Sequence, residues 1–139
     1  MTKEFCYSFL RRHQLAVLAT LAGDANQPQA ALVGFAVTPG LEIVFDTVRS
    51  SRKYSNLCAN PRVALVIGWS HETSVQYEGR AIELLSGEGA EYKETYYSVF
   101  PDGRQRAAEW AGLTHFVIRP SWIRYSNFNA PPVIEEMNF

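Results

Sequence analysis

Three cations stand close together near the start of a predicted helix, in the segment DTVRSSRKYSNLCANPRV at residues 46–63. Near that start, Arg49, Arg52 and Lys53 are opposed only by Asp46. A helix N-terminus carries the positive end of the helix dipole, so each cation there is disfavoured by about 0.3–1 kcal/mol at an exposed site. A bound phosphate would reverse that balance, because each charge-assisted hydrogen bond to it contributes roughly 1.5–3 kcal/mol. These residue types therefore suit the binding of a small anion.

Hydroxyl groups and free amides accompany the cations. Thr47 ends the preceding predicted strand, and Ser50 or Ser51 is placed to cap the helix. The first N–H groups of a helix have no acceptor within it. A strand end, hydroxyls, free amides and two adjacent cations together are typical of a phosphate site. The alternative is a basic turn whose side chains are simply solvated.

The composition limits the other classes of function. The chain has 139 residues and a formal net charge of −1, which indicates a single domain over residues 1–139 and argues against a nucleic-acid or anionic-membrane binder. No run approaches the roughly 20 apolar residues of a membrane helix. The first residues lack the pattern of a secretory signal, so we expect a cytoplasmic protein. Cys6 and Cys58 lie far apart, and the 3 histidines have no Cys, Asp or Glu at ligand spacing, so we expect no metal site.

Short apolar segments separated by turn signals indicate a mainly β protein with short helices. The pattern predicts helices at 2–13, 51–59 and within 88–110, strands at 14–22, 29–37, 41–47, 62–69, 74–84 and 114–128, and a C-terminal tail at 129–139. We expect the segments 29–37 and 41–47 to form a hairpin through Pro39-Gly40. Gly79 is expected to mark a bulge, and Pro61 to stop the second helix at Asn60. Because most links between strands are short, an antiparallel barrel is favoured over a parallel sheet.

The segment FDTVRSSRKYSNLCANPRVALVIGW resembles the core of the pyridoxamine-phosphate-oxidase-like flavoproteins, the FMN-binding split barrels. These proteins share a T-x-x-x-S-R-K string, a short helix, NPRV and an apolar strand. The string here is Thr47, Ser51, Arg52 and Lys53. The similarity covers residues 14–85 and extends more weakly to the last predicted strand. It implies an antiparallel split β-barrel of the FMN-binding type, with FMN as cofactor and these four residues around its phosphate and ribityl chain.

The resemblance also implies residues that contact the flavin ring. Backbone groups of Leu32, Val33 and Gly34 would reach the ring, and Asp46 would lie beside it. Gly34 suits this role because backbone without a side chain approaches a planar ligand closely. The alternative for Gly34 is packing within the strand.

Residues on the last predicted strand are implied to complete the site from a second subunit. Trp122, Arg124 and Ser126 share one face by strand alternation. Related proteins use this region of the partner subunit to close over the flavin, so the resemblance implies a homodimer with cofactor sites at its interface. Trp122 would stack near the ring and Arg124 would meet its polar edge. The alternative for Trp122 is packing in the core or the dimer interface.

Two departures from the family pattern concern the substrate. This chain has Ala31 where full-length pyridoxamine phosphate oxidases have an arginine, and Ala36 where they have a lysine. It ends in the short acidic segment NAPPVIEEMNF, where they have a longer basic one. Oxidation of pyridoxamine phosphate is therefore not expected.

We expect an FMN-dependent oxidoreductase or flavin reductase that acts on a small-molecule substrate or electron donor, with hydride transfer at flavin N5. No catalytic residue is assigned; Arg124 is a candidate for stabilising the reduced flavin. The alternative is a non-catalytic protein that binds or senses a flavin or another phosphate-bearing cofactor, since split barrels also accept a deazaflavin or heme. A third option is a dimeric interaction protein whose basic turn binds phosphate incidentally.

Overall fold

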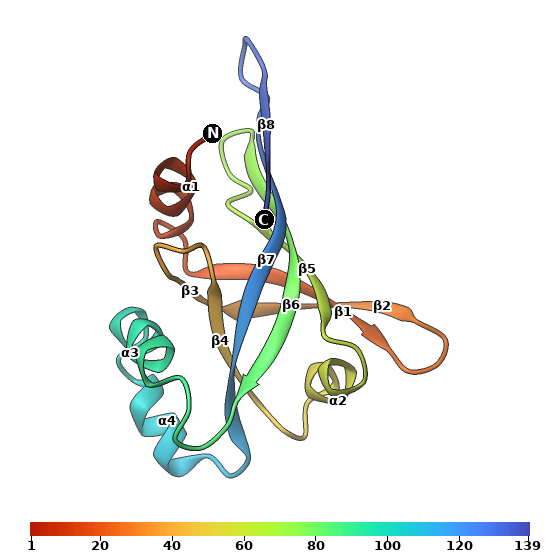
Figure 1. Ribbon diagram of the computed structural model, residues 1–139, viewed down its shortest axis with the longest axis vertical. Coiled ribbons are helices and arrows are strands. Elements are labelled where there is room, and N and C mark those ends of the chain that lie inside the picture. Colours follow the sequence, from red (N-terminus) through yellow and green to blue (C-terminus); the bar gives the residue numbers. More distant parts are fainter.

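The computed structural model describes residues 1–139 and shows a mainly β architecture with four short helices (Figure 1). In chain order the elements are α1 (Lys3–Leu10), β1 (Leu15–Ala22), β2 (Gln27–Gly34), β3 (Ala36–Val37), β4 (Ile43–Val48), α2 (Arg52–Ala59), β5 (Arg62–Ile67), β6 (Thr73–Leu84), α3 (Ala90–Val99), α4 (Gly103–Glu109), β7 (Leu113–Asn127) and β8 (Val133–Asn138). None of the helices is long and apolar enough to cross a bilayer.

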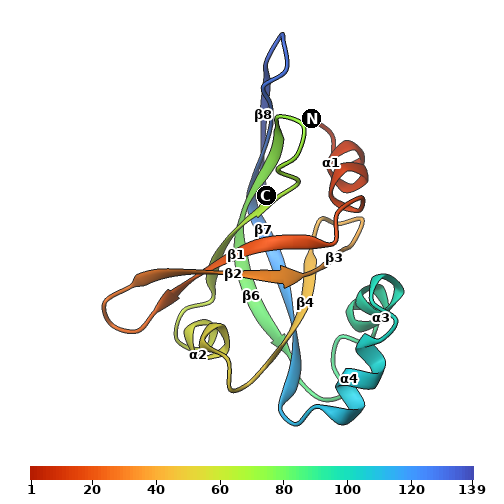
Figure 2. The same ribbon diagram turned by 180° about the vertical axis from the view of Figure 1, so that it is seen from behind.

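The strands form one sheet that curls on itself, and every pair in it is antiparallel (Figures 1 and 2). Its order is β2-β1-β5-β6-β7-β4-β3, and β8 pairs with β7 beside this path. β4 pairs with the first half of β7 and β8 with the second half, so both lie along the same edge of β7. The predicted fold class, mainly β and antiparallel with short helices, is confirmed.

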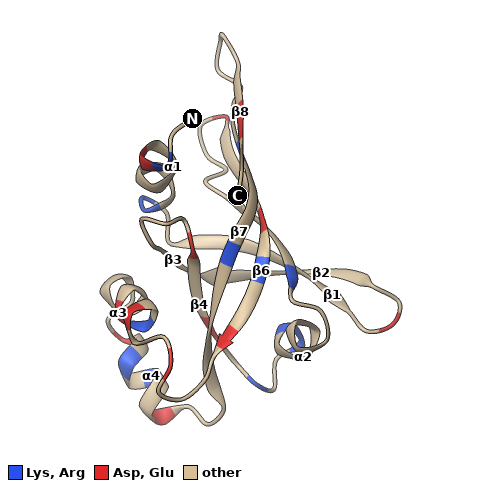
Figure 3. Ribbon diagram, in the orientation of Figure 1, with Lys and Arg blue, Asp and Glu red and all other residues tan.

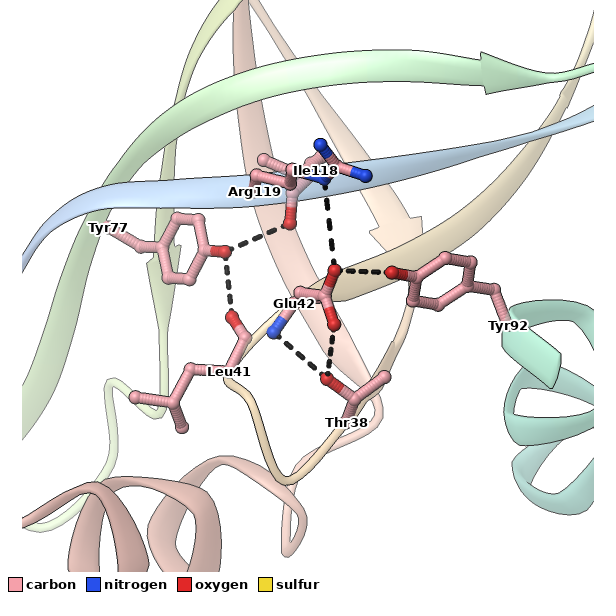
Figure 4. A network of polar contacts seen from close by, with 7 residues as sticks. All are labelled: Thr38, Leu41, Glu42, Tyr77, Tyr92, Ile118 and Arg119. Atoms are coloured by element: carbon pink, nitrogen blue, oxygen red, sulfur yellow. Dashed lines mark hydrogen bonds and ion pairs between the residues drawn. The ribbon is translucent and has the colours of Figure 1, made fainter. Parts of the chain in front are cut away.

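The curled sheet encloses the main hydrophobic core, in which Tyr77, Phe35 and Phe45 are the largest fully buried side chains. The Tyr77 hydroxyl donates a shared hydrogen bond to the carbonyl oxygens of Leu41, at 2.8 Å, and Ile118, at 3.1 Å (Figure 4). Burial raises the pKa of this phenol. Its hydrogen bonds offset the penalty of burying a hydroxyl and tie β6 to β7 and to the turn before β4.

Helices α3 and α4 lie together on the outer side of the sheet (Figure 2). Tyr96 of α3 packs in a second buried cluster with Ala36, Val44, Leu84 and Val117. The residues on either side of Val44 in β4 pack in the main core, so by strand alternation the Val44 side chain points away from that core. The two helices therefore cover a sheet face that would otherwise expose apolar side chains.

The local predictions around α2 and Gly79 are confirmed. Helix α2 begins after Ser51 and ends at Asn60, immediately before Pro61. The pairing of β6 with β7 shifts between Glu78 and Gly79, as expected for a bulge. A Cβ atom at Gly79 would lie 2.3 Å from the backbone oxygen of Arg119, so this close strand approach requires glycine.

The predicted hairpin between 29–37 and 41–47 is wrong over most of its length. Only Ala36–Val37 pair with β4, whereas β2 pairs with β1. The chain changes partner at Phe35, whose side chain is fully buried and whose N–H donates to the Gln14 carbonyl at 3.0 Å. The single apolar run at residues 29–37 pairs first with β1 and then with β4. The local sequence does not show at which residue the pairing partner changes.

The predicted tail at 129–139 contains a strand. Residues of β8 pair with Trp122–Asn127 of β7, on the part of the β7 edge that β4 leaves free. Pro131 and Pro132 are a strong local stop signal, but here they precede the returning strand of a hairpin. The β7–β8 hairpin extends beyond the curled body at one end, and the β1–β2 hairpin extends in another direction (Figure 1).

Candidate functional site

Two hydroxyl groups fix the start of α2. Ser51 Oγ accepts a hydrogen bond from the Tyr54 N–H at 3.2 Å, and it lies 2.9 Å from Oγ1 of Thr47, a buried residue near the end of β4. The N–H groups of Arg52 and Lys53 have no acceptor within the helix. The first turn of α2 therefore presents free donors at the positive end of the helix dipole.

Two of the three cations near this turn have no counter-charge within the chain. Arg52 Nε donates to the neutral Gln29 Oε1 at 3.1 Å, and neither Arg52 nor Lys53 takes part in any ion pair of the chain. Arg49 differs, because its Nη2 lies 3.4 Å from Glu83 Oε2. The positive charge that the chain leaves unbalanced here is therefore on Arg52 and Lys53.

A cavity of about 330 Å³ opens between the first turns of α2 and the β1–β2 hairpin. It is lined by Thr20, Gln29, Ala30, Ala31, Arg52, Lys53 and Asn56. Asn56 Nδ2 donates to Thr20 Oγ1 at 2.9 Å and to Gln29 Oε1 at 3.0 Å, which holds the Gln29 amide in place beside Arg52. No acidic residue lines the cavity. Two cations, free helix amides and no carboxylate are the donor set that fits a phosphate group.

The structure thus brings together Thr47, Ser51, Arg52 and Lys53, the four residues of the predicted string. The hydroxyls of Thr47 and Ser51 organise the turn, whereas Arg52 and Lys53 line the cavity itself. Sequence reasoning missed Asn56, although it follows Arg52 by four residues and so shares its helix face. It also missed the lining residues of β1 and β2, which approach α2 through long-range packing that leaves no local signal.

Leu32, Val33 and Gly34 continue the strand that supplies Ala31 to the cavity. Leu32 is 59% exposed on the outer face of the sheet, while Val33 is buried in the main core. A Cβ atom at Gly34 would lie 2.9 Å from Cζ of Phe100, so packing against this ring explains the glycine. The flavin contacts of these three residues remain a prediction.

Asp46 points to the opposite side of β4 from Thr47. Its Oδ2 lies 3.3 Å from Arg106 Nη2, and Arg106 also contacts Asp102 at 2.6 Å and the Tyr96 hydroxyl at 3.3 Å. These partners come from α3 and α4, so the Asp46 side chain belongs to a different charged cluster from the α2 cavity. A cofactor contact of Asp46 remains a prediction.

His115 lies beside Asp46 on the neighbouring strand and is only 4% exposed. Its Nε2 has no hydrogen-bond partner, and the rings of Tyr96 and Tyr97 each approach it edge-on with centroids 5.6 Å away. Burial lowers the pKa of this imidazole, and Asp46 opposes that shift. The neutral form is therefore favoured under α3, away from the cavity.

Trp122 and Arg124 of β7 are joined by a residue that the sequence did not indicate. Glu136 of β8 accepts hydrogen bonds from Trp122 Nε1 at 3.3 Å and Arg124 Nε at 2.9 Å, and it also contacts Arg124 Nη2. Arg124 and the neighbouring Trp122 indole hold the pKa of the Glu136 carboxyl below its ordinary value. The predicted tail thus supplies the counter-charge of Arg124.

Cross-strand pairing places these residues relative to the α2 side of the sheet. Leu32 pairs with Val17, Val17 with Val66, Val66 with Gln76, and Gln76 with Arg124. Four strand spacings separate Leu32 from Arg124, or about 19 Å along the sheet. Within one chain, Arg124 and Leu32 therefore share the outer face without approaching each other.

Residues 2–127 match the family described as Pyridoxamine 5'-phosphate oxidase. A curated pyridoxine/pyridoxamine 5'-phosphate oxidase from Burkholderia lata is 35% identical over 117 residues, which make up 84% of this chain and 52% of that protein. The chain spans about half the length of the curated relatives that it matches.

Solved structures share the same fold. A heme binding protein from Mycobacterium smegmatis has a TM-score of 0.80 and 16% identity, covering 98% of this chain and 57% of that one. A pyridoxamine 5'-phosphate oxidase-related, FMN binding protein from Nostoc punctiforme has a TM-score of 0.66 and 10% identity, covering 99% of this chain and 92% of that one. The family match, the identity to the curated relative and the curled antiparallel sheet agree, and this chain is a split β-barrel that belongs to the pyridoxamine 5'-phosphate oxidase family.

Proposed function

We propose that this protein binds FMN, with the cofactor's phosphate in the cavity beside α2, and uses it as an oxidoreductase on a small-molecule substrate. The observation that carries the proposal is the pair Arg52 and Lys53, which line a cavity without carboxylates and have no ion-pair partner in the chain. When bound, FMN supplies hydride transfer at its flavin ring, so no protein nucleophile is required.

The chain's own residues have three roles in this proposal. Arg52 and Lys53 bind and neutralise the phosphate, together with the free N–H groups of the first turn. Thr47 and Ser51 hold that turn in place through their hydroxyl pair and the cap to Tyr54. The backbone of β2 runs from the cavity toward Gly34 and would lie along the rest of the cofactor.

A homodimer with the cofactor sites at its interface is part of the proposal. Leu32, Val17 and Val66 form a row of apolar side chains on the outer face, of which Leu32 is 59% and Val66 38% exposed. Burial of such a row stabilises association. Because Trp122 and Arg124 lie about four strand spacings from β2 within one chain, a partner subunit is the source from which such residues would reach the cofactor.

The proposed substrate is not pyridoxamine phosphate. Ala31 lines the cavity where the family pattern implies an arginine. Ala36 is 2% exposed in the cluster under α3, and a lysine there would be buried without a partner. The C-terminal strand carries Glu135 and Glu136, so it offers no second set of cations for a phosphorylated substrate.

Heme binding is the second candidate, because a similar structure is described as a heme binding protein. Heme iron takes His, Cys, Met or Tyr as axial ligand, and none of these residue types lines the α2 cavity. His115, the one buried histidine, lies under α3 and points among aromatic rings. A phosphate-bearing flavin therefore suits the cavity better.

The absorbance spectrum of the purified protein, followed by titration with FMN, tests the proposal. We expect flavin bands and saturable uptake, and Arg52→Gln with Lys53→Gln should weaken FMN binding at least about hundredfold, because two charge-assisted hydrogen bonds are lost. The matched control is Arg11→Gln with Arg12→Gln, which removes the same charge from an exposed pair outside this cavity.

The outcomes separate the alternatives. A colourless protein that does not take up FMN contradicts the proposal, and a heme spectrum supports the second candidate. Anaerobic reduction of the FMN-loaded protein by NADH or NADPH indicates an oxidoreductase. Binding without reduction by any donor tested supports a non-catalytic flavin-binding protein instead.

A further inference from the structure

We propose a second anion site on the outer face of the sheet, formed by Arg62, Arg80 and Arg119, for a small molecule with two or more anionic groups such as a diphosphate. Arg62 of β5 pairs directly with Arg80 of β6, and Arg80 pairs with Arg119 of β7. Paired residues of an antiparallel sheet point to the same side, and neighbouring strands lie about 4.8 Å apart. Figure 3 shows the cationic segments of β5, β6 and β7 side by side.

Such a row needs an explanation, because like charges directly opposite each other destabilise a sheet. The chain places one carboxylate at its end: Glu42 Oε2 lies 4.0 Å from Arg119 Nε (Figure 4). That carboxylate is shared, since it accepts a hydrogen bond from the Tyr92 hydroxyl at 2.5 Å. The side chains of Arg62 and Arg80 take part in none of the chain's ion pairs or hydrogen bonds. Their guanidinium groups are the members of the row that lack a partner.

These two arginines also line a cavity, of about 530 Å³, which gives a ligand a concave surface. Its other lining residues are Ala19, Thr20, Leu21, Pro28, Val63, Ala64, Glu78, Gly79 and Ser121. Glu78 is the only carboxylate among them, and it forms no ion pair with either arginine. Two guanidinium groups and one carboxylate leave the wall positive, and Arg119 continues the row beside it.

The charge pattern selects the class of ligand. Guanidinium groups bind phosphate and carboxylate oxygens in a bidentate manner, and a row spaced by the strands matches several anionic oxygens better than a single charge. The site is distinct from the α2 cavity, because the two share no cation and only Thr20 lines both. It lies about 13 Å along β5 from Val66, beyond the apolar row of the proposed dimer face.

Calorimetric titration with inorganic pyrophosphate tests the site. The parent protein is the Arg52→Gln, Lys53→Gln variant, in which the α2 cavity is disabled, so the result does not depend on the proposed FMN site. We expect saturable binding that Arg62→Gln with Arg80→Gln weakens at least about tenfold. Glu78→Gln should tighten it by removing the opposing charge. Arg11→Gln with Arg12→Gln, the control with the same change in net charge, should leave it within about twofold.

Three results would overturn the proposal. The first is no saturable pyrophosphate binding to the parent. The second is an equal loss of affinity in the Arg11, Arg12 control, which would indicate attraction by net charge alone. The third is an Arg62→Gln, Arg80→Gln protein that binds pyrophosphate as the parent does. If that variant instead changes oligomeric state while the parent binds no pyrophosphate, the row belongs to a protein contact.

Discussion

Asp46 and Thr47 are neighbours on β4, yet their side chains lie beside two different charged regions. The two regions differ in whether their cations have carboxylate partners within the chain. On the side of α3 and α4, Asp46 meets Arg106, which is 20% exposed and has a second carboxylate in Asp102. On the side of α2, Arg52 is exposed and its one polar partner is the neutral amide of Gln29. In the first region each of these charged side chains has a partner of opposite charge within the chain, whereas in the second Arg52 and Lys53 have none.

This difference shows how a binding site is recognised among charged residues. A cation that already has a carboxylate partner needs no ligand, as for Arg106 and for Arg49 beside Glu83. A cation beside a cavity without such a partner leaves the negative charge to a ligand. We infer that the unbalanced region is the cofactor site and that the balanced region stabilises the fold.

The largest effect on stability is expected from Asp46→Ala. Removing this carboxylate takes away the largely buried partner of Arg106, which should cost about 2–3 kcal/mol of unfolding free energy. Urea unfolding measures the change. Asp102→Ala is the control, because the Asp102 side chain is 71% exposed and its ion pair with Arg106 should contribute at most about 1 kcal/mol. Equal effects of the two substitutions would contradict the contrast between buried and exposed partners.

A smaller effect is expected from Ser51→Ala at the start of α2. The substitution removes the cap on the Tyr54 N–H and the hydrogen-bond partner of Thr47, which should cost about 1 kcal/mol of unfolding free energy. FMN binding should weaken as well, because the first turn is no longer fixed. The exposed Ser50 offers a matched control in Ser50→Ala, for which both quantities should stay unchanged. If Ser51→Ala lowered stability but left FMN affinity unchanged, the serine cap would stabilise the helix without contributing to the cofactor site.

The smallest expected effect is a pH dependence from His115. Burial lowers its pKa in the folded protein below the ordinary value of 6.5, so the unfolded chain binds more protons as the solution becomes acidic. Its contribution to stability is therefore complete above 6.5 and is lost as the pH falls through that value toward the folded pKa. Unfolding free energies measured between about pH 7.5 and pH 5.5 should fall more steeply for the parent than for His115→Gln. Parallel curves would contradict this assignment, since the other titrating groups are common to both proteins.

The elements that the sequence predicted well have local signals. Helix α2 has a serine cap and a proline stop, and the bulge at Gly79 has a glycine that the approach of β7 requires. The string from Thr47 to Lys53 is itself local, so its assembly at one helix end was predictable. These features depend on residues within a few positions of one another.

The errors concern pairing between distant segments. Nothing near residues 27–34 shows that they pair with β1 rather than β4, and nothing near Pro131 shows that β8 fills the free edge of β7. The same limit hid Glu136 as the partner of Arg124, and Gln29 as the partner of Arg52. The side of β4 to which Asp46 points follows from alternation, but its partner Arg106 lies 60 residues away in the chain.

Whether the cations without a counter-charge bind the cofactor is tested most directly by comparing FMN affinity in Arg52→Gln and Arg49→Gln. Both substitutions remove one arginine charge near the start of α2, but Arg49 has a carboxylate partner in Glu83 and Arg52 has none. We expect Arg52→Gln to raise the FMN dissociation constant at least about tenfold and Arg49→Gln to change it less than about twofold. Equal effects, or a larger effect at Arg49, would contradict the claim that the unbalanced cations mark the cofactor site.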